Sequence, residues 1–357
     1  MKIDRLDVTV YRVPTERPEA DGTFDWTATT AVVVTAIAGD AEGVGWTYST
    51  GAAAAVVSDL LEGAVIGRAV EDVGACFEAM RRACRNVGTR GLVMQAISAV
   101  DIALWDLKAR TRDMSLSALF GAARSGVPIY GSGGFTTMTD AELAEQIAQW
   151  RELGCGAVKI KIGEAWGSCV GRDLDRVRQL ADQASGAALM VDANGGYTQD
   201  QARRVGAALD DLGVVWFEEP VSSDDIHGLG TVRQAVRCAV AAGEYVSDEF
   251  EAAGLCDVVD CLQLDATRCG GYTGFMRCSA VARANNLQVS AHCAPALHVP
   301  IAAATTNLRH LEYFADHVRL EPLLFDGIPV ALGGVLTANE SAGHGYRVGS
   351  GAREYRI

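Results

Sequence analysis

The chain has 357 residues, 49% of them hydrophobic and 21% charged, and its formal net charge is −14 at pH 7. A chain of this length can bury a large core and form more than one domain. The acidic balance argues against nucleic acid or an anionic membrane as a partner, because both favour clustered Lys and Arg side chains. It leaves room for an acidic small-molecule substrate, provided that a cation sets the local field.

The chain has no apolar stretch as long as a membrane span and no apolar signal-peptide core at its start. Its ten cysteines are scattered and form no C-x-x-C pair. In a large chain this pattern indicates reduced, mostly buried thiols and argues against a structural zinc site. We therefore expect a cytoplasmic protein.

The first part of the chain predicts three strands, at residues 3–13, 31–37 and 43–48, which form an antiparallel meander. Between the first two strands lies the polar stretch 14–26, which is too long for a simple hairpin turn. We expect it to be a loop, and long loops of this length often serve as lids.

Helical patterns follow the three strands. Residues 52–61 are Ala-rich, and apolar side chains recur every three or four positions over 73–84 and 97–107. Strands first and helices after them predict an α+β domain over residues 1–120. Residues 121–126 read as the linker that follows it.

From Val127 onwards short apolar strands alternate with helical stretches, the pattern of parallel βαβ units. This predicts an α/β fold with a (β/α)₈ barrel over residues 121–320. The Gly-rich remainder, residues 321–357, is too short for a domain, so we expect it to fold back onto the first one. The expected barrel strands are 127–131, 157–162, 188–192, 214–218, 240–244, 261–265, 288–292 and 309–313.

The strand G-A-V-K-I-K-I-G at 156–163 carries Lys159 and Lys161 on one face, because side chains two positions apart point the same way. Alternating lysines also protect an exposed edge strand from pairing, which is the competing interpretation. Ionisable residues at the ends of the later strands favour an active site, because (β/α)₈ barrels place their catalytic groups there. These residues are Asp192, Glu218, Glu244, Asp265, His292 and Glu312.

Asp192, Glu218 and Glu244 end three consecutive strands. Three close carboxylates repel one another unless a cation neutralises them. Oxygen ligands with open positions for substrate suit Mg²⁺. Either Glu218 or Glu219 could be the ligand, because strand alternation sends them to opposite sides.

A base on each side of a bound carboxylate is the arrangement that removes the α-proton. Lys161 would be one base, and His292, held in one tautomer by Asp265, would be the other. Lys159 would add positive charge beside the developing enediolate. Glu312 would donate a hydrogen bond if burial raised its pKa, and Lys161 would need a lowered pKa.

In order along the chain, the motifs resemble those of the enolase superfamily and its mandelate racemase subgroup, and the resemblance covers essentially the whole chain. The matching segments are K-I-K at 159–161, V-D-A-N at 191–194, F-E-E-P at 217–220, G-E at 243–244, L-D-A-T-R-C-G-G at 264–271, S-A-H at 290–292 and L-E at 311–312. The tail departs from the family's P-G-x-G turn and reads S-A-G-H-G-Y at 341–346.

The resemblance implies an N-terminal capping domain and one Mg²⁺ held by Asp192, Glu218 and Glu244. It further implies that loops 14–26 and 46–50 close over a small carboxylate substrate. Segment 45–49 resembles that of acid-sugar dehydratases acting on galactarate or talarate. The residues expected to bind substrate are Asn194, Arg268, Tyr48 and Trp26, and a second acid group would be met by Arg12, Arg17 or Arg268.

Dehydration of a sugar acid to a 2-keto-3-deoxy acid is the leading hypothesis. The same two bases could instead racemise or epimerise a 2-hydroxy acid. A Schiff-base lyase using Lys161 and a non-catalytic binding protein are the remaining alternatives. A homo-oligomer is expected because families of this type commonly form them.

Overall fold

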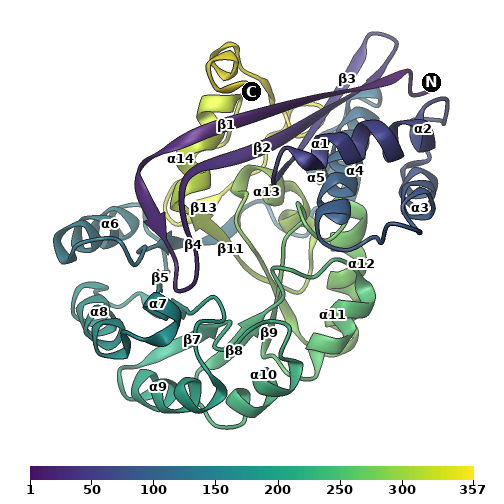
Figure 1. Ribbon diagram of the computed structural model, residues 1–357. Helices are drawn as coiled ribbons and strands as arrows, with labels where there is room; N and C mark the ends of the chain where they lie inside the picture. Colours follow the sequence, from purple (N-terminus) through teal and green to yellow (C-terminus); the bar gives the residue numbers. More distant parts are fainter.

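A closed barrel of eight parallel strands forms the centre of the computed structural model, which describes residues 1–357 (Figure 1). Pairing of the last barrel strand with the first closes the ring. An N-terminal capping domain covers one end, so the fold predicted from the sequence is confirmed. The strands are β4 (Val127–Gly133), β5 (Ala157–Lys161), β6 (Ala188–Asp192), β7 (Val214–Glu218), β8 (Ala239–Ala242), β9 (Cys261–Leu264), β10 (Gln288–Ala291) and β11 (Leu308–Phe314).

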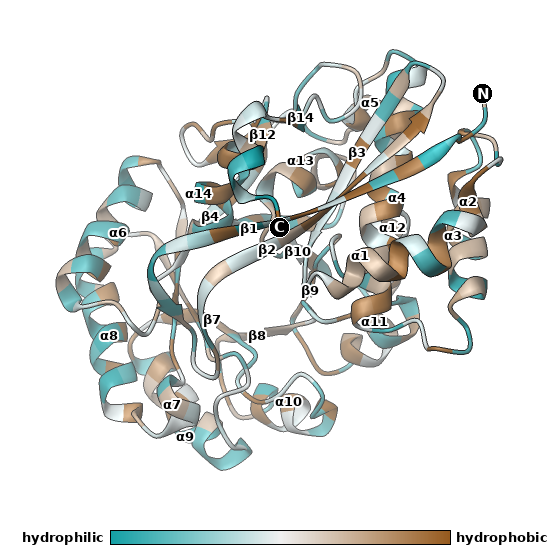
Figure 2. Ribbon diagram, turned by 45° about the horizontal axis from the view of Figure 1, so that its top comes forward, coloured by the Kyte–Doolittle hydropathy of each residue, from teal (hydrophilic) through white to brown (hydrophobic).

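Helices surround the barrel, and hydrophilic residues lie on the outer helices (Figure 2). Thr139 and Thr198 begin two of these helices with capping boxes, in which a side chain three residues later returns the hydrogen bond. The helices are α6 (Asp140–Glu152), α7 (Glu164–Gly167), α8 (Val170–Gln183), α9 (Gln199–Asp211), α10 (Ile226–Arg233), α11 (Glu249–Cys256), α12 (Gly271–Ala284), α13 (Pro295–Ala304) and α14 (Ala315–Leu324). No helix in the structure has both the length and the apolar character needed to cross a bilayer.

The capping domain packs a three-stranded antiparallel sheet against a long buried helix. The sheet consists of β1 (Arg5–Ala20), β2 (Asp25–Ala38) and β3 (Ala41–Tyr48), and the helix is α4 (Leu92–Thr111). Contact is close because β3 has glycine where it crosses α4: a Cβ on Gly45 would lie 2.4 Å from the backbone of α4. The other helical segments are α1 (Ala52–Val56), a π-helix (Val57–Leu61), α2 (Glu62–Val65), α3 (Val73–Ala83) and α5 (Leu116–Phe120).

The stretch 14–26 is for the most part strand, so the expected loop was wrong, and its role as a lid stays a prediction. β1 runs to Ala20 and β2 starts at Asp25, leaving a short turn. Because β1 is an edge strand, Pro14 and Pro18 need not donate to a neighbour there, and the irregular register between Pro14 and Glu19 absorbs them. The second expected loop, 46–50, likewise begins inside β3, and Trp46 is fully buried against Phe325.

The tip of the β1–β2 hairpin rests on the mouth of the barrel (Figure 1). Gly22 touches the barrel backbone so closely that a Cβ there would lie 2.6 Å from the carbonyl oxygen of Ile162. The amide of Trp166 donates to the carbonyl of Gly22 at 2.9 Å, and the Thr136 hydroxyl donates to the carbonyl of Asp21 at 2.8 Å. The hairpin therefore forms a roof over the carboxyl ends of the barrel strands.

The C-terminal segment contacts the capping domain. The amide of His344 donates to Asp106 at 2.8 Å, its imidazole contacts the carbonyl of Val44 at 2.7 Å, and the amide of Ile357 donates to Val10 at 3.0 Å. This segment contains β12 (Phe325–Asp326), β13 (Val335–Leu336), β14 (Arg347–Val348) and a 3₁₀-helix (Ser350–Tyr355). The boundaries 1–120, 121–320 and 321–357 stay a prediction.

Candidate active site

Strand register brings the ionisable residues of the barrel together. Lys161 lies opposite Asp192 in the pairing of β5 with β6, and Asp192 lies opposite Glu218 in the pairing of β6 with β7. All three are buried although they are charged. The matched strand ends place these three side chains next to one another. Burying a charge is costly unless it is paired, and here the lysine and the carboxylates form one connected cluster.

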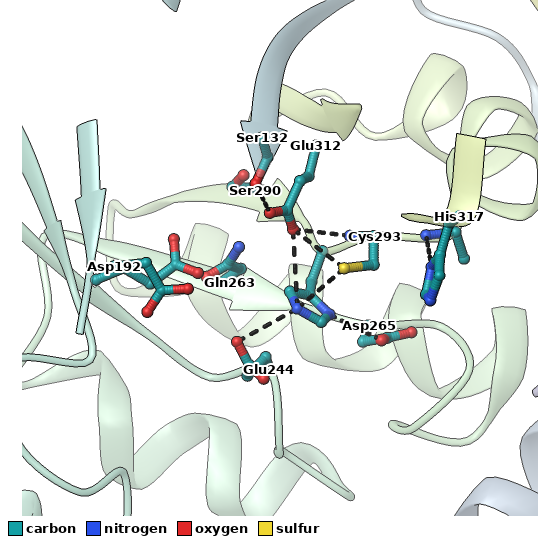
Figure 3. Close-up of polar contacts among 12 residues, drawn as sticks. Ser132, Asp192, Glu244, Gln263, Asp265, Ser290, Cys293, Glu312 and His317 are labelled. Carbon is teal, nitrogen blue, oxygen red and sulfur yellow. Dashed lines mark hydrogen bonds and ion pairs between the residues drawn. The ribbon is translucent and has the colours of Figure 1, made fainter. Parts of the chain in front are cut away.

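Asp192, Glu218 and Glu244 each direct a carboxylate oxygen to one place, and these oxygens lie within 4.8 Å of one another. The alternative between Glu218 and Glu219 is resolved for this cluster in favour of Glu218. Glu219 follows the end of β7 with φ of 37°, and its side chain does not join the three acids. Figure 3 shows Asp192, Glu244 and Glu312 on different sides of one space.

The donor set fits a hard divalent cation. Oδ1 of Asn194 and Oε2 of Glu244 are buried and have no hydrogen bond, although Nε2 of His292 lies 3.3 Å from the Glu244 oxygen. Burial raises the pKa of Glu218 to about 8; Lys159 opposes this shift, and Asp192 and Glu312 add to it. A cation at these oxygens would relieve both the unpaired acceptors and the repulsion, and oxygen-only ligation is what Mg²⁺ prefers.

Lys159 forms ion pairs with several of the acids. Its Nζ lies 2.6 Å from Glu218 and 2.8 Å from Glu312. Glu312 also accepts hydrogen bonds from the Ser132 hydroxyl at 2.5 Å and from the amide of Cys293 at 2.9 Å. Burial alone would raise the pKa of Glu312, but Lys159 and His292 hold it well below its usual range, so the expected protonated Glu312 is wrong.

Lys161 is tied to Asp192. Its Nζ donates to Oδ2 of Asp192 at 2.5 Å. Burial would lower the pKa of Lys161, yet the Asp192 carboxylate raises it. The expected lowering of this pKa is therefore not met in the free site, where Lys161 is an ammonium ion.

His292 lies on the other side of the acids and has a fixed orientation. Its Nδ1 is 2.9 Å from Oδ2 of Asp265, and its Nε2 is 3.3 Å from Oε2 of Glu244. Burial opposes protonation, but Glu244, Glu312 and the bond to Asp265 raise the pKa of His292. With Nδ1–H directed to Asp265, Nε2 is the nitrogen that can exchange a proton.

A cavity of about 350 Å³ lies between the barrel mouth and the cap. Lys161 and His292 both line it, as do the four residues expected to contact substrate, which are Asn194, Arg268, Tyr48 and Trp26. A cavity of this size accommodates a small polar acid. Of the predicted chemical groups, Lys161, Glu244, Asp265 and His292 line this cavity, whereas Lys159, Asp192, Glu218 and Glu312 do not.

Three of those four side chains already use their polar atoms. The Tyr48 hydroxyl donates to Glu321 at 3.2 Å, and Nε1 of Trp26 donates to Glu19 at 2.9 Å, so both offer mainly their rings to the cavity. Arg268 donates to Oε1 of Glu244 at 3.0 Å. Asn194 alone keeps an unpaired acceptor.

The other two arginines expected to meet a second acid group lie elsewhere. Arg17 forms an ion pair with Glu142, and neither Arg17 nor Arg12 lines the cavity. Both stand on the edge strand β1 and are exposed there.

Several lining residues were missed by sequence reasoning. They are Asp21, Thr29, Cys293, Asp316 and His317. Asp316 and His317 follow the end of β11, which is the position that (β/α)₈ barrels use for function, so that rule could have identified them. Asp21 and Thr29 enter the cavity only because the hairpin folds over the mouth.

Comparison with known families agrees with this geometry. Residues 6–121 match the family described as mandelate racemase / muconate lactonizing enzyme, N-terminal domain, and residues 142–351 match enolase C-terminal domain-like proteins. Together the two matches cover nearly the whole chain.

Two relatives of known activity are similar in sequence. The L-talarate/galactarate dehydratase of Salmonella typhimurium is 32% identical over 76% of this chain and 70% of its own length. The 3,6-anhydro-alpha-L-galactonate cycloisomerase of Streptomyces coelicolor is 30% identical over 96% of each chain.

Solved structures share the whole fold. A mandelate racemase/muconate lactonizing enzyme-like protein from Rubrobacter xylanophilus is 40% identical, with a TM-score of 0.97 over 100% of both chains. The Salmonella dehydratase, solved with Mg and L-lyxarohydroxamate, has a TM-score of 0.92 at 27% identity, covering 100% of this chain and 93% of its own.

Proposed function

The chain belongs to the mandelate racemase/muconate lactonizing enzyme family of the enolase superfamily, and from this membership we propose that it dehydrates a sugar acid to a 2-keto-3-deoxy acid. The observation that carries the proposal is the cavity lined on one side by Lys161 and on the other by His292, beside three clustered acids. The similarity to the Salmonella dehydratase supports the choice of reaction.

Asp192, Glu218 and Glu244 are the residues that we propose hold Mg²⁺. A cation bound there would stabilise the negative charge that develops on the substrate carboxylate as the α-proton leaves. Lys159, which is paired with Glu218 and Glu312, would contribute a fixed positive charge beside the substrate carboxylate. Arg268 would keep Glu244 oriented, because its guanidinium already donates to that carboxylate.

Lys161 and His292 would carry out the proton transfers. Either Lys161, after its ammonium has lost a proton, or His292 as neutral imidazole takes the α-proton, according to the configuration at C2, and leaves the electron pair on the substrate as an enediolate. His292, as an imidazolium, then gives a proton to the β-hydroxyl, the C3–O bond breaks and water leaves. The resulting enol loses the proton of its C2 hydroxyl, gains a proton at C3 and becomes the 2-keto acid.

Two other outcomes of the same α-proton removal are the alternatives. Returning a proton to the opposite face gives racemisation or epimerisation, and the presence of a base on each face favours this. Cycloisomerisation has in its favour the similarity, over nearly the whole length, to the Streptomyces cycloisomerase. The proposed reaction differs from both in releasing water and a 2-keto acid.

We further propose that the enzyme is cytoplasmic and assembles as a homo-oligomer. Its ten free thiols, nine of them buried, fit a reducing compartment. Sedimentation of the purified protein measures the assembly directly, and a monomer at micromolar concentration would reject that part.

A panel of sugar acids tests the function. With MgCl₂ present, we expect at least one acid to yield a 2-keto-3-deoxy acid, detected as its semicarbazone, and EDTA to abolish turnover reversibly. Parallel NMR in D₂O follows α-proton exchange. Exchange without 2-keto acid from every substrate would replace dehydration by racemisation or epimerisation. Turnover that survives EDTA and is trapped by borohydride would instead indicate a Schiff base on Lys161.

A further inference from the structure

We propose that the cavity selects monocarboxylic sugar acids whose far end is neutral and hydroxylated, and that Asp316 and His317 make this selection. The inference rests on the proposed function, because it assumes that the substrate carboxylate binds at the three acids and the two bases. It departs from the resemblance of segment 45–49 to that of dehydratases acting on galactarate or talarate, which are diacids.

The end of the cavity remote from the chemistry is formed by the cap and by the start of α14. Asp316 and His317 come four and five residues after Glu312, so they stand above it as the chain leaves β11. Thr29 of the hairpin meets Asp316 there, its hydroxyl donating to Oδ2 at 2.5 Å. In Figure 3, His317 lies beyond Cys293, apart from Asp192.

No free cation faces this end of the cavity. Its lining contains two permanently charged cations, Lys161 and Arg268. Lys161 is paired with Asp192, and Arg268 is held between Glu244 at 3.0 Å and Asp265 at 3.6 Å, so both belong to the chemical centre. A second carboxylate at the far end would therefore have no partner of opposite charge.

His317 offers a neutral hydrogen-bond donor instead. Its Nδ1 accepts a hydrogen bond from the amide of Ala294 at 3.0 Å, which places the ring proton on Nε2. Its ring is stacked on Tyr48, with centroids 3.7 Å apart. Burial lowers the pKa of His317 to about 4; the nearby Asp316 and Asp265 oppose that shift, and His292 and Arg268 add to it. Its Nε2–H therefore suits a hydroxyl oxygen and supplies no positive charge to a carboxylate.

Asp316 gives the same region an acidic acceptor. Besides Thr29, it binds Arg319 at 2.7 Å, but Arg319 does not line the cavity. Hydroxyl groups can donate to Asp316 and accept from His317, whereas another carboxylate would face a like charge. Recognition of a polyol tail is the arrangement that satisfies every group.

Matched pairs of substrates test this inference without any mutation. Each pair, such as gluconate with glucarate or galactonate with galactarate, has the same hydroxyl configuration and differs only at C6. We expect kcat/KM for the best aldonate to exceed that for its aldarate by at least about tenfold. Equal values, or a preference for the diacid, would overturn the inference.

Two variants identify the selecting residues. Asp316→Asn removes the negative charge and should shift the aldonate-to-aldarate ratio of kcat/KM towards the diacid. His317→Phe removes the donor and should raise KM for the aldonate with little change in kcat. Asp175→Asn, an exposed change on α8, is the control for the first variant. An unchanged ratio in Asp316→Asn, with thermal unfolding like the parent's, would reject the role of Asp316.

Failure of this inference differs from failure of the proposed function. If no monoacid or diacid gives a 2-keto acid or α-proton exchange, the function itself is wrong. If diacids are dehydrated as well as or better than monoacids, only the inference falls.

Discussion

Nδ1 of His292 lies 2.9 Å from Oδ2 of Asp265, and this contact fixes which imidazole nitrogen serves the substrate. Asp265 is itself held by the amide of Thr267 at 2.7 Å and by Arg268 at 3.6 Å. The carboxylate therefore cannot rotate away, and the imidazole keeps one tautomer.

Replacing Asp265 by asparagine should impair the proton steps made by His292. The amide can rotate to donate to Nδ1, which would move the ring proton to Nε2, so we expect kcat to fall on the order of 10²- to 10⁴-fold. Thermal unfolding and the dependence of stability on Mg²⁺ should change little. The low-pH limb of the kcat/KM profile should also shift, because an orienting acid also sets the pKa of its histidine. An unshifted profile would make Asp265 merely structural.

Removing the two bases one at a time should show which face of the substrate each base serves. Lys161→Met and His292→Asn should each abolish turnover, while far-UV circular dichroism stays unchanged. With a substrate whose α-proton faces Lys161, the His292→Asn variant should retain α-proton exchange in D₂O and form no product. Near-normal rates in both variants would show that the bases are misassigned.

A methyl group at position 22 should lift the roof of the cavity. In Gly22→Ala the Cβ would lie 2.6 Å from the carbonyl oxygen of Ile162 and 2.9 Å from those of Gly163 and Ala193. We expect kcat/KM to fall on the order of tenfold, because displacement of the hairpin loosens the site. Gly171→Ala, at a helical position with no atom within 4 Å, is the control and should act like the parent. Equal activity in the two variants would mean that the hairpin tip does not close the site.

Glu321 should make the protein less stable as the pH rises. Burial raises the pKa of Glu321 to about 8, while the unfolded chain ionises near the ordinary value of 4.5. Between these values the unfolded state releases a proton that the folded state keeps, so the free energy of unfolding falls as the pH rises. From pH 5 to pH 8 the loss is roughly 3.5 kcal/mol: the maximum is about 1.4 kcal/mol per pH unit, reduced because the carboxyl is partly protonated in the unfolded chain at pH 5 and partly ionised in the folded protein at pH 8.

Glu321→Gln should remove that part of the pH dependence. Its amide can still serve the amide of Ala296 and the Tyr48 hydroxyl, which are the present partners of Glu321. Urea unfolding at pH 5 and pH 8 measures the difference, with the exposed Glu340→Gln as control. If the free energy of unfolding of Glu321→Gln fell with pH as steeply as that of the parent, the prediction would be contradicted. Some dependence should remain, because burial also raises the pKa of Glu19 to about 8.

The barrel was predictable because its strands are short and apolar and most carry an ionisable residue at or near the carboxyl end. Asp192 and Glu218 occupy such strand ends, and parallel register then forces their carboxylates together. The hairpin was not predictable in the same way. Pro14 and Pro18 argue against a strand in isolation, and only an edge position in the completed sheet makes them acceptable.

The protonation states were also beyond the sequence. Burial and pairing act in opposite directions on Lys161 and Glu312, and the result depends on distances of 2.5 Å to Asp192 and 2.8 Å to Lys159. The far end of the cavity depends on contacts such as Thr29 with Asp316, whose positions are 287 residues apart in the chain. Spacing along the sequence carries no such distances.

The roof of the cavity comes from the β1–β2 hairpin and its floor from the barrel, so under the proposed function the selecting groups, on the hairpin and at the start of α14, are separate from the residues that move protons. Substitutions confined to the hairpin and the first turn of α14 should therefore change which acids are accepted without altering the residues that remove the α-proton and stabilise the enediolate. A library restricted to those positions is a direct route to new substrates from this scaffold.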